Sequence, residues 1–184
     1  MILEIVQYGH PALRAKGRRI EKIDARIREL AQEMLETMYG ADGVGLAAQQ
    51  VGMPIQLCVI DVTEVKDRPS VLRIAGNPVD IEEHMPLVLI NPEVETLGEP
   101  QTGVEGCLSF PGIRADVTRP GGVRVRAQTL DGSELDFEAD GLLARAIQHE
   151  FDHLQGILFI DRISVLERRR IEDELRGEPN RASI

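Results

Sequence analysis

The chain is poor in several residue types, and each shortage narrows what it can be. Its 184 residues include two Cys, two Tyr, four Phe and no Trp. Two cysteines cannot build the disulfide framework of a small secreted domain. Because aromatic side chains are scarce, leucine, isoleucine and valine must fill most of the core, and a chain of this length is large enough to form one as a single domain.

Long apolar runs and an excess of basic residues are also missing. No stretch approaches the roughly 20 apolar residues of a membrane-spanning helix, and residues 1–4, Met-Ile-Leu-Glu, do not begin a signal peptide. The formal net charge of −10 argues against a general nucleic-acid binder, which usually carries a basic face. We therefore expect a cytoplasmic protein that binds neither DNA nor membranes.

The apolar pattern predicts two main helices and several short strands. Apolar residues at three- and four-residue steps predict a helix from Asp24, its cap, to Gly40. A second helix, capped by Asp140, ends before Gly156. Strands are predicted at 57–62, 87–90, 94–97, 123–130, 135–138 and 157–160, with a hairpin turn at 131–132. This order predicts an α+β fold with short antiparallel or mixed sheets around the second helix.

The remaining segments are more polar. Residues 64–86 carry many charges with glycine and proline, which predicts a long surface excursion with some ordered parts, and Asn91-Pro92 predicts a turn. A charged helix is predicted at 165–176, followed by a loose tail at 177–184. We therefore expect one catalytic domain at 1–164 and a C-terminal helix with a flexible tail at 165–184.

The stretch most informative about function is His149-Glu150-x-x-His153 in the second predicted helix. Residues four apart share one face of a helix, so both imidazoles can reach one metal ion. Glu150 lies one step round the helix, close enough to exchange a proton with water at that metal. Paired surface histidines would give the same pattern, but the apolar character of this helix argues against exposure.

A catalytic zinc-type site needs a third protein ligand, and the sequence offers three options. A histidine three residues after Gly156 would complete one peptidase motif, but Phe159 stands there. A downstream glutamate is a weak option because the candidates, which are Glu167, Glu172 and Glu174, lie in the charged C-terminal helix. Cys107 is the third option, since a thiolate binds divalent metals well, although a lone cysteine is more often a small buried apolar residue.

Three motifs together resemble the signatures of the peptide deformylase family, in the order that family has them. They are Gly43-Val44-Gly45-Leu46-Ala47-Ala48-Gln49-Gln50, Glu105-Gly106-Cys107-Leu108-Ser109 and Gln148-His149-Glu150-Phe151-Asp152-His153. The resemblance covers the chain from the first helix to about Ser164. The excursion at 73–86 is longer than in the compact bacterial members of that family.

The resemblance implies a hydrolase that removes the N-formyl group from the formyl-methionine of newly made proteins and releases formate. It implies that Cys107, His149 and His153 hold the metal and that Glu150 acts as general base and then acid toward water attacking the formyl carbonyl. The oxyanion would be stabilised by Gln50 and the Leu108 backbone N–H.

Other residues acquire expected roles by the same resemblance. Peptide binding is expected at Val44, Gly45, Gly106, Arg114, Leu142 and Ala146, with the stem of Arg145 contributing at most. Asp152 and Arg119 are expected to form a pair that supports the metal ligands from behind.

The resemblance also implies one divalent metal ion, with Fe(II) as the physiological ion and Zn, Ni or Co able to occupy the site in a purified sample. The expected partners are N-formyl-methionyl nascent peptides, and a transient ribosome contact through the C-terminal helix is suggested by Arg168–Arg170. Two rivals stay open: a zinc peptidase that uses Glu172 in place of Cys107, and a metal-dependent protein that binds N-termini without turnover.

Overall fold

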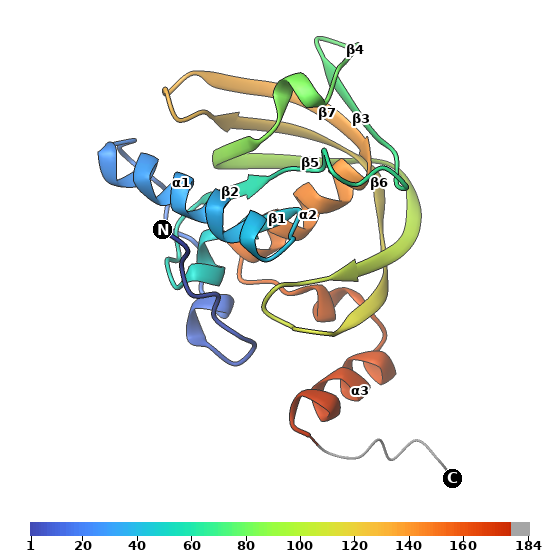
Figure 1. Cartoon of the computed structure of the whole chain (residues 1–184). Helices are drawn as coiled ribbons and strands as arrows, with labels where there is room; N and C mark the ends of the chain where they lie inside the picture. Colours follow the sequence, from blue (N-terminus) through green and yellow to red (C-terminus); the bar gives the residue numbers. More distant parts are fainter. Residues whose placement is uncertain (178–184) are drawn as a thin grey trace.

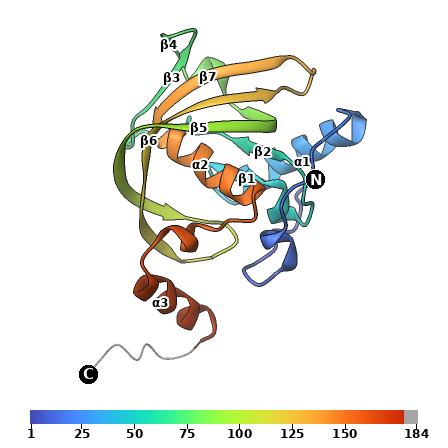
Figure 2. The same cartoon turned by 180° about the vertical axis from the view of Figure 1, so that it is seen from behind.

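One antiparallel sheet and a central helix, α2, make up the framework of this computed structural model, which describes residues 1–177 (Figures 1 and 2). Within that range the strand order is β1-β2-β5-β6-β7-β3-β4, and every strand pair is antiparallel. The helices are α1 Ala25–Gly40, α2 Leu142–Leu154 and α3 Val165–Leu175. The strands are β1 Gly45–Ala47, β2 Leu57–Ile60, β3 Ser70–Ile74, β4 Asn77–Val79, β5 Leu87–Gly106, β6 Arg114–Gln128 and β7 Glu134–Gly141. The predicted α+β class is confirmed.

Helix α2 is almost entirely enclosed. Every residue of it except Phe151 is buried, and the helix contacts strands on both halves of the sheet, β1 and β2 as well as β6 and β7. Its buried polar residues are Arg145, Gln148, His149, Glu150, Asp152 and His153. Since buried polar groups need partners, this helix must be surrounded by complementary charges or by a ligand.

Two further packing clusters hold the ends of the chain. Helix α1 begins as predicted, with the Asp24 side chain accepting a hydrogen bond from the Ile27 amide, and its apolar face packs on β2. Helix α3 is anchored by Ile171, which is fully buried in a cluster with Phe110 and Phe159. The division at residue 164 stays a prediction, and the tail predicted at 177–184 lies, apart from Gly177, outside the described residues.

The predicted turn at Asn91-Pro92 is wrong. Segments 87–90 and 94–97 belong to one strand, β5, which runs on to Gly106, and the extra residues form a register shift between Ile90 and Glu93. Asn91 adopts φ 51° there and exchanges hydrogen bonds of 2.9 Å with the backbone of Ile20. A bulge of this kind bends a strand without ending it, so turn residues can lie inside a continuous ladder.

The excursion at 64–86 contains more structure than the sequence suggested. Strands β3 and β4 form a hairpin, and β3 pairs with β7 at the edge of the sheet. Leu72 anchors the hairpin because it is buried between the partly exposed residues of β3. Charged and turn residues concealed this short strand in the sequence.

Two local predictions around α2 are wrong as well. Asp140 does not cap the helix: it pairs with Arg73 at 2.6 Å, and the N-cap residue is Gly141, with φ 72°. The first two amides of α2 donate instead to groups at the start of β3: that of Leu142 to the Pro69 carbonyl, and that of Leu143 to the Ser70 hydroxyl. Residues 157–160 are not a strand, since Phe159–Arg162 forms a 3₁₀ turn that packs its apolar side chains inward.

The described residues contain no helix that is both long enough and apolar enough to cross a membrane.

Candidate active site

Cys107, His149 and His153 bring three metal-ligand atoms together. Cys107 directly follows β5, whereas the two histidines lie one turn apart on α2. The potential ligand atoms of the three residues all lie within 4.8 Å of one another, and Cys107 Sγ is 3.4 Å from His153 Nε2. His149 Nδ1 is 2.9 Å from a Glu105 carboxylate oxygen, which leaves Nε2 as the free ligand atom of that ring. The set of donors fits a divalent metal.

The surroundings shift the pKa values of the two histidines in opposite directions. Burial alone would lower the pKa of His149, but hydrogen bonds to Cys107 and Glu105 hold that pKa well above its ordinary value. Burial lowers the pKa of His153 well below its ordinary value. His153 is thus poised to remain neutral, which is the form in which an imidazole binds a metal.

Glu150 lies next to the ligand cluster and is buried, with 4% of its surface exposed. Its Oε2 atom has no hydrogen-bond partner among the described residues. Burial raises the pKa of this carboxyl to about 7, so it can both accept and release a proton near neutrality. An unpartnered carboxylate beside three metal-ligand atoms is the expected arrangement for a general base.

Gln50 faces the same space with its amide orientation fixed. The Ala47 backbone N–H donates to Gln50 Oε1 at 2.9 Å, which turns the amide nitrogen toward the metal-ligand cluster. That nitrogen lies 3.5 Å from Cys107 Sγ and 3.3 Å from the Ser109 hydroxyl. Gln50 therefore presents a donor beside the potential ligand atom of Cys107.

A cavity of about 680 Å³ opens onto these groups. Among its lining residues are Val44, Gly45, Gln50, Gly106, Cys107, Leu108, Arg114, Leu142, Ala146, His149 and Glu150. The sequence-predicted residues are thus brought together around the cavity, except that His153, Arg119 and Asp152 are buried and do not line it. Its volume lies in the range typical of pockets that bind small molecules or short peptide segments.

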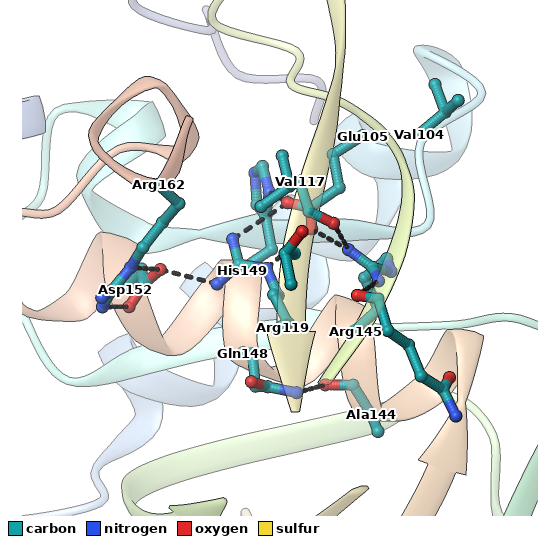
Figure 3. Close-up of polar contacts among 12 residues, drawn as sticks. Val104, Glu105, Val117, Arg119, Ala144, Arg145, Gln148, His149, Asp152 and Arg162 are labelled. Atoms are coloured by element: carbon teal, nitrogen blue, oxygen red, sulfur yellow. Dashed lines mark hydrogen bonds and ion pairs between the residues drawn. The ribbon is translucent and has the colours of Figure 1, made fainter. Parts of the chain in front are cut away.

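Glu105 is the centre of a buried charge network (Figure 3). It accepts two hydrogen bonds from Arg119 of β6, at 2.6 and 2.9 Å, and one from Arg145 of α2 at 2.8 Å, in addition to that of His149. Although burial opposes ionisation, these donors hold the pKa of Glu105 far below its ordinary value. An ionised Glu105 keeps the His149 ring in one orientation and one tautomer.

Asp152 extends this network to a third arginine. Arg119 donates to Asp152 at 2.9 Å, as the sequence predicted, and Arg162 binds both oxygens of the same carboxylate at 3.1 and 2.9 Å (Figure 3). Arg119 therefore connects the two carboxylates, and Arg162 closes the network from the 3₁₀ turn after α2. The network ties α2 to β5, β6 and the following turn.

Sequence reasoning missed three of these residues. Glu105 was recognised as part of a motif but received no role, although an acidic residue two positions before a metal-ligating cysteine is a usable signal. Arg145 was expected to contribute only its stem, yet its guanidinium also binds the carbonyls of Val117 and Gln101. Arg162 received no predicted role, because it follows residues 157–160, which were predicted to form an ordinary strand.

The two other third-ligand options are not supported by the structure. Phe159 stacks against the His149 ring with centroids 6.0 Å apart and is an apolar wall of the site. Glu172 lies in α3, where its carboxylate accepts hydrogen bonds from Tyr8 and Arg168. Among the described residues, only Cys107 joins the two histidines in a group that could hold a metal.

Comparisons with known proteins agree with this geometry. The family model for polypeptide deformylase matches residues 2–169. A peptide deformylase from Methylacidiphilum infernorum is 52% identical over 182 residues, which cover 97% of this chain and 95% of that protein. One from Opitutus terrae is 46% identical, covering 96% and 92%.

Solved structures give the same result. A Synechococcus elongatus peptide deformylase in complex with actinonin matches with a TM-score of 0.79 and 41% identity, covering 99% of this chain and 90% of that one. A peptide deformylase from Ehrlichia chaffeensis matches with a TM-score of 0.83 and 32% identity, covering both chains completely. The Cys107-His149-His153 cluster, the unpartnered Glu150 carboxylate and these matches along nearly the whole chain lead to one conclusion: the chain belongs to the polypeptide deformylase family.

Proposed function

We propose that this protein hydrolyses the formamide bond of N-formyl-methionyl peptides and releases formate, with Cys107, His149 and His153 as its metal ligands. The observation that carries the proposal is the unpartnered buried carboxylate of Glu150 beside three metal-ligand atoms that lie within 4.8 Å of one another. When bound there, a divalent ion lowers the pKa of water and polarises a carbonyl. The family matches support the same reaction class.

The proton transfers are assigned to Glu150. Its carboxylate takes a proton from the attacking water, and its carboxylic acid then delivers that proton to the nitrogen of the leaving peptide. A pKa of about 7 suits both steps, because neither protonation state is strongly disfavoured near neutrality. Enclosure of the group by α2 and β1 keeps bulk water away from it.

Two hydrogen-bond donors, the Gln50 amide and the Leu108 backbone N–H, are assigned to stabilise the negative charge that develops on the formyl oxygen. The fixed orientation of Gln50 supports its role because a preorganised donor needs no rearrangement during the reaction. One such donor is worth about 3–4 kcal/mol of transition-state stabilisation.

The peptide is proposed to bind in an extended conformation beside β1 and the end of β5. Strand β1 is the last strand on its side of the sheet, so its outer edge can accept an added strand at Val44 and Gly45. Gly106 would offer backbone groups from the opposite wall, and Arg114 lies at the exposed end of the lining. The methionine side chain is assigned to the part of the cavity lined by Leu142, Ala146 and the His149 ring.

Fe(II) is proposed as the physiological ion, because it is the usual ion in the family that the sequence resembles. The donor set of one thiolate and two imidazoles also suits Zn, Ni and Co, so the ligands alone do not select among these ions. A ferrous ion with a thiolate ligand needs reducing surroundings, which supports the proposed cytoplasmic location.

The decisive experiment measures metal content and formate release together. Protein loaded anaerobically with Fe(II), Zn, Ni or Co in turn is assayed on formyl-Met-Ala-Ser and on acetyl-Met-Ala-Ser. We expect formate from the first peptide only. Under anaerobic conditions, the Fe(II)-loaded protein should release formate faster than the protein loaded with the other metals. Glu150→Gln should retain metal and peptide binding while turnover falls by several orders of magnitude. If the loaded wild type binds formyl peptides without any turnover, the protein is a binding module and the proposal fails.

A transient ribosome contact through α3 is proposed separately. Arg168 and Arg170 are already paired with acidic residues, so Arg169, which is exposed and has no ion pair within residues 1–177, is the residue that carries this proposal. Val165 and Leu166 are 78% and 80% exposed at the start of the same helix. Arg169→Glu should reduce co-sedimentation with ribosomes; unchanged co-sedimentation would count against the contact.

A further inference from the structure

Two guanidinium groups converge beside Gly103 of β5. A Cβ atom placed on Gly103 would lie 3.1 Å from Arg145 Nε and 3.2 Å from a terminal nitrogen of Arg68. Like charges this close are tolerated only where each is neutralised or can move away. The absence of a side chain at Gly103 leaves the space that the two groups share.

The two arginines are held very differently. Arg145 is buried, and it donates to the Glu105 carboxylate and to the carbonyls of Val117 and Gln101. Arg68 is half-buried on the chain between β2 and β3, and within residues 1–177 it has a single hydrogen bond, to the Val104 carbonyl at 3.1 Å, and no ion pair. Arg145 is therefore a fixed part of the framework, and Arg68 is the one that a small change can displace.

Arg68 also stands between two cavities. A second cavity of about 210 Å³ adjoins the active-site cavity and is lined by residues such as Thr102, Gly103, Pro120 and Gly141. The lining residues that the two cavities share are Asp67, Arg68, Leu142 and Arg145. Leu142 and Arg145 are buried in α2. The loop before β3 supplies the other two shared residues, Asp67 and Arg68. Because the side chain of Asp67 is exposed, Arg68 is the main residue of this loop that separates the two cavities.

We propose that Arg68 is a specificity-determining residue that limits the length of the pocket for the first side chain of the substrate. This inference rests on the proposed function, because it takes the Leu142 and Ala146 region as the pocket for that side chain. A substrate side chain longer than methionine would reach the wall that the two cavities share. Its apolar end would then remove water from the Arg68 guanidinium, and this desolvation costs free energy. Removing the Arg68 side chain joins the cavities and offers the longer chain room.

The test compares two formylated peptides that differ only in the length of the first side chain. The probes are formyl-norleucyl-Ala-Ser, whose side chain matches methionine in length, and the 2-aminooctanoyl analogue, which has two more methylenes. The ratio of their kcat/KM values is measured for the wild type, Arg68→Ala and Arg68→Lys. Burial of each added methylene is worth about fourfold, so Arg68→Ala should raise the ratio of the longer peptide's kcat/KM to the shorter peptide's by about fifteenfold. Arg68→Lys keeps a long side chain and should stay close to the wild type.

Lys66→Ala is the matched control. Lys66 lies on the same loop, is exposed and pairs with Glu82, and it lines neither cavity. Its substitution should leave the ratio unchanged. An unchanged ratio in Arg68→Ala, or an equal rise in Arg68→Lys or Lys66→Ala, would overturn the inference.

A second readout separates this inference from the proposed function. Calorimetry on the metal-loaded protein gives the dissociation constants of the two deformylated peptides, and Arg68→Ala should tighten binding of the longer one relative to the shorter one. If the wild type hydrolyses neither formyl peptide, the proposed function fails. If hydrolysis occurs but neither the kcat/KM ratio nor the affinity ratio responds to Arg68→Ala, only the assignment of Arg68 fails.

Discussion

Gly45 and Glu150 are packed so closely that any side chain at position 45 would displace the Glu150 carboxylate. A Cβ atom there would lie 2.5 Å from Glu150 Oε1 and 2.9 Å from its Cδ, although the backbone of Gly45 is not in the left-handed region. The glycine is therefore required by space and not by backbone conformation. It allows β1 to run directly against the carboxylate to which we assign proton transfer.

Gly45→Ala should consequently impair turnover without removing the metal. The methyl group must push the Glu150 carboxylate away, and a displacement of about 1 Å in a reacting group typically costs on the order of 100-fold in rate. Deformylase activity and metal content are measured on the same samples. Gly40→Ala, at the end of α1, is the control because its added methyl would meet only the flexible end of Ile2. Full activity of Gly45→Ala would show that Glu150 does not need its present position.

Cys107→Ala should abolish metal retention. The substitution leaves two histidines, and a site with two neutral ligands holds a divalent ion far more weakly than one with a thiolate. Metal content after anaerobic loading and dialysis is the measurement. Cys58→Ala is the matched control, since Cys58 is the other cysteine and is buried within β2. Equal metal content in the two variants would remove Cys107 from the ligand set.

Arg119→Met should strongly destabilise the fold. The substitution leaves Glu105 and Asp152 buried with only part of their compensating charge, and breaking a buried pair on one side costs about 3–5 kcal/mol. Urea unfolding of the metal-free protein measures the loss. Arg124→Met is the control on the same strand, because its pair with Asp136 is exposed and solvent screening leaves such a pair with little effect on stability. Equal losses would mean that the buried network contributes no more than a surface pair.

The pair of Tyr39 and Asp61 predicts how stability depends on pH. The Tyr39 hydroxyl donates to Asp61 at 2.6 Å. Burial and the neighbouring carboxylate raise the pKa of Tyr39 to about 12. Burial works against ionisation of Asp61, but hydrogen bonds from Thr63 and Tyr39 lower its pKa below the ordinary value.

The lowered pKa of Asp61 contributes stability that is present above its unfolded value and is lost as the pH falls through the folded value. The raised pKa of Tyr39 contributes stability that is present below its unfolded value and is lost as the pH rises toward 12. Tyr39→Phe should therefore be less stable than the wild type by a constant small amount between about pH 5 and pH 9. The difference should shrink at more acidic and more alkaline pH. A difference that grows in acid would contradict this assignment.

Local patterns in the sequence predict the helices and the two histidines well, because both depend on residues a few positions apart. The cap at Asp24 and the shared face of His149 and His153 follow from helix geometry alone. Cys107 is 42 or more positions away from the histidines, and its place beside them depends on how β5 crosses α2. No local pattern contains that crossing, so the resemblance of three motifs was needed to supply it.

The failures have the same origin. Asp140 is a good capping residue, but Ser70 from a distant strand satisfies the amide of Leu143, and Asp140 pairs with Arg73 instead. Asn91 has the composition of a turn, but its side chain is held by the backbone of Ile20 inside a continuous strand. In each case a contact between distant segments outweighs a local preference.

The positions of the proposed ligands along the chain have a consequence for biosynthesis. Cys107 directly follows β5 and lies in the first two thirds of the chain, whereas His149 and His153 belong to α2, which follows the β6–β7 hairpin. A nascent chain that has emerged only as far as β7 contains one of the three proposed ligands, Cys107, and neither of the other two. It can hold an ion there only loosely, and its thiol is open to oxidation. With the proposed ligand set, we expect the complete metal site to form only after α2 has left the ribosomal tunnel.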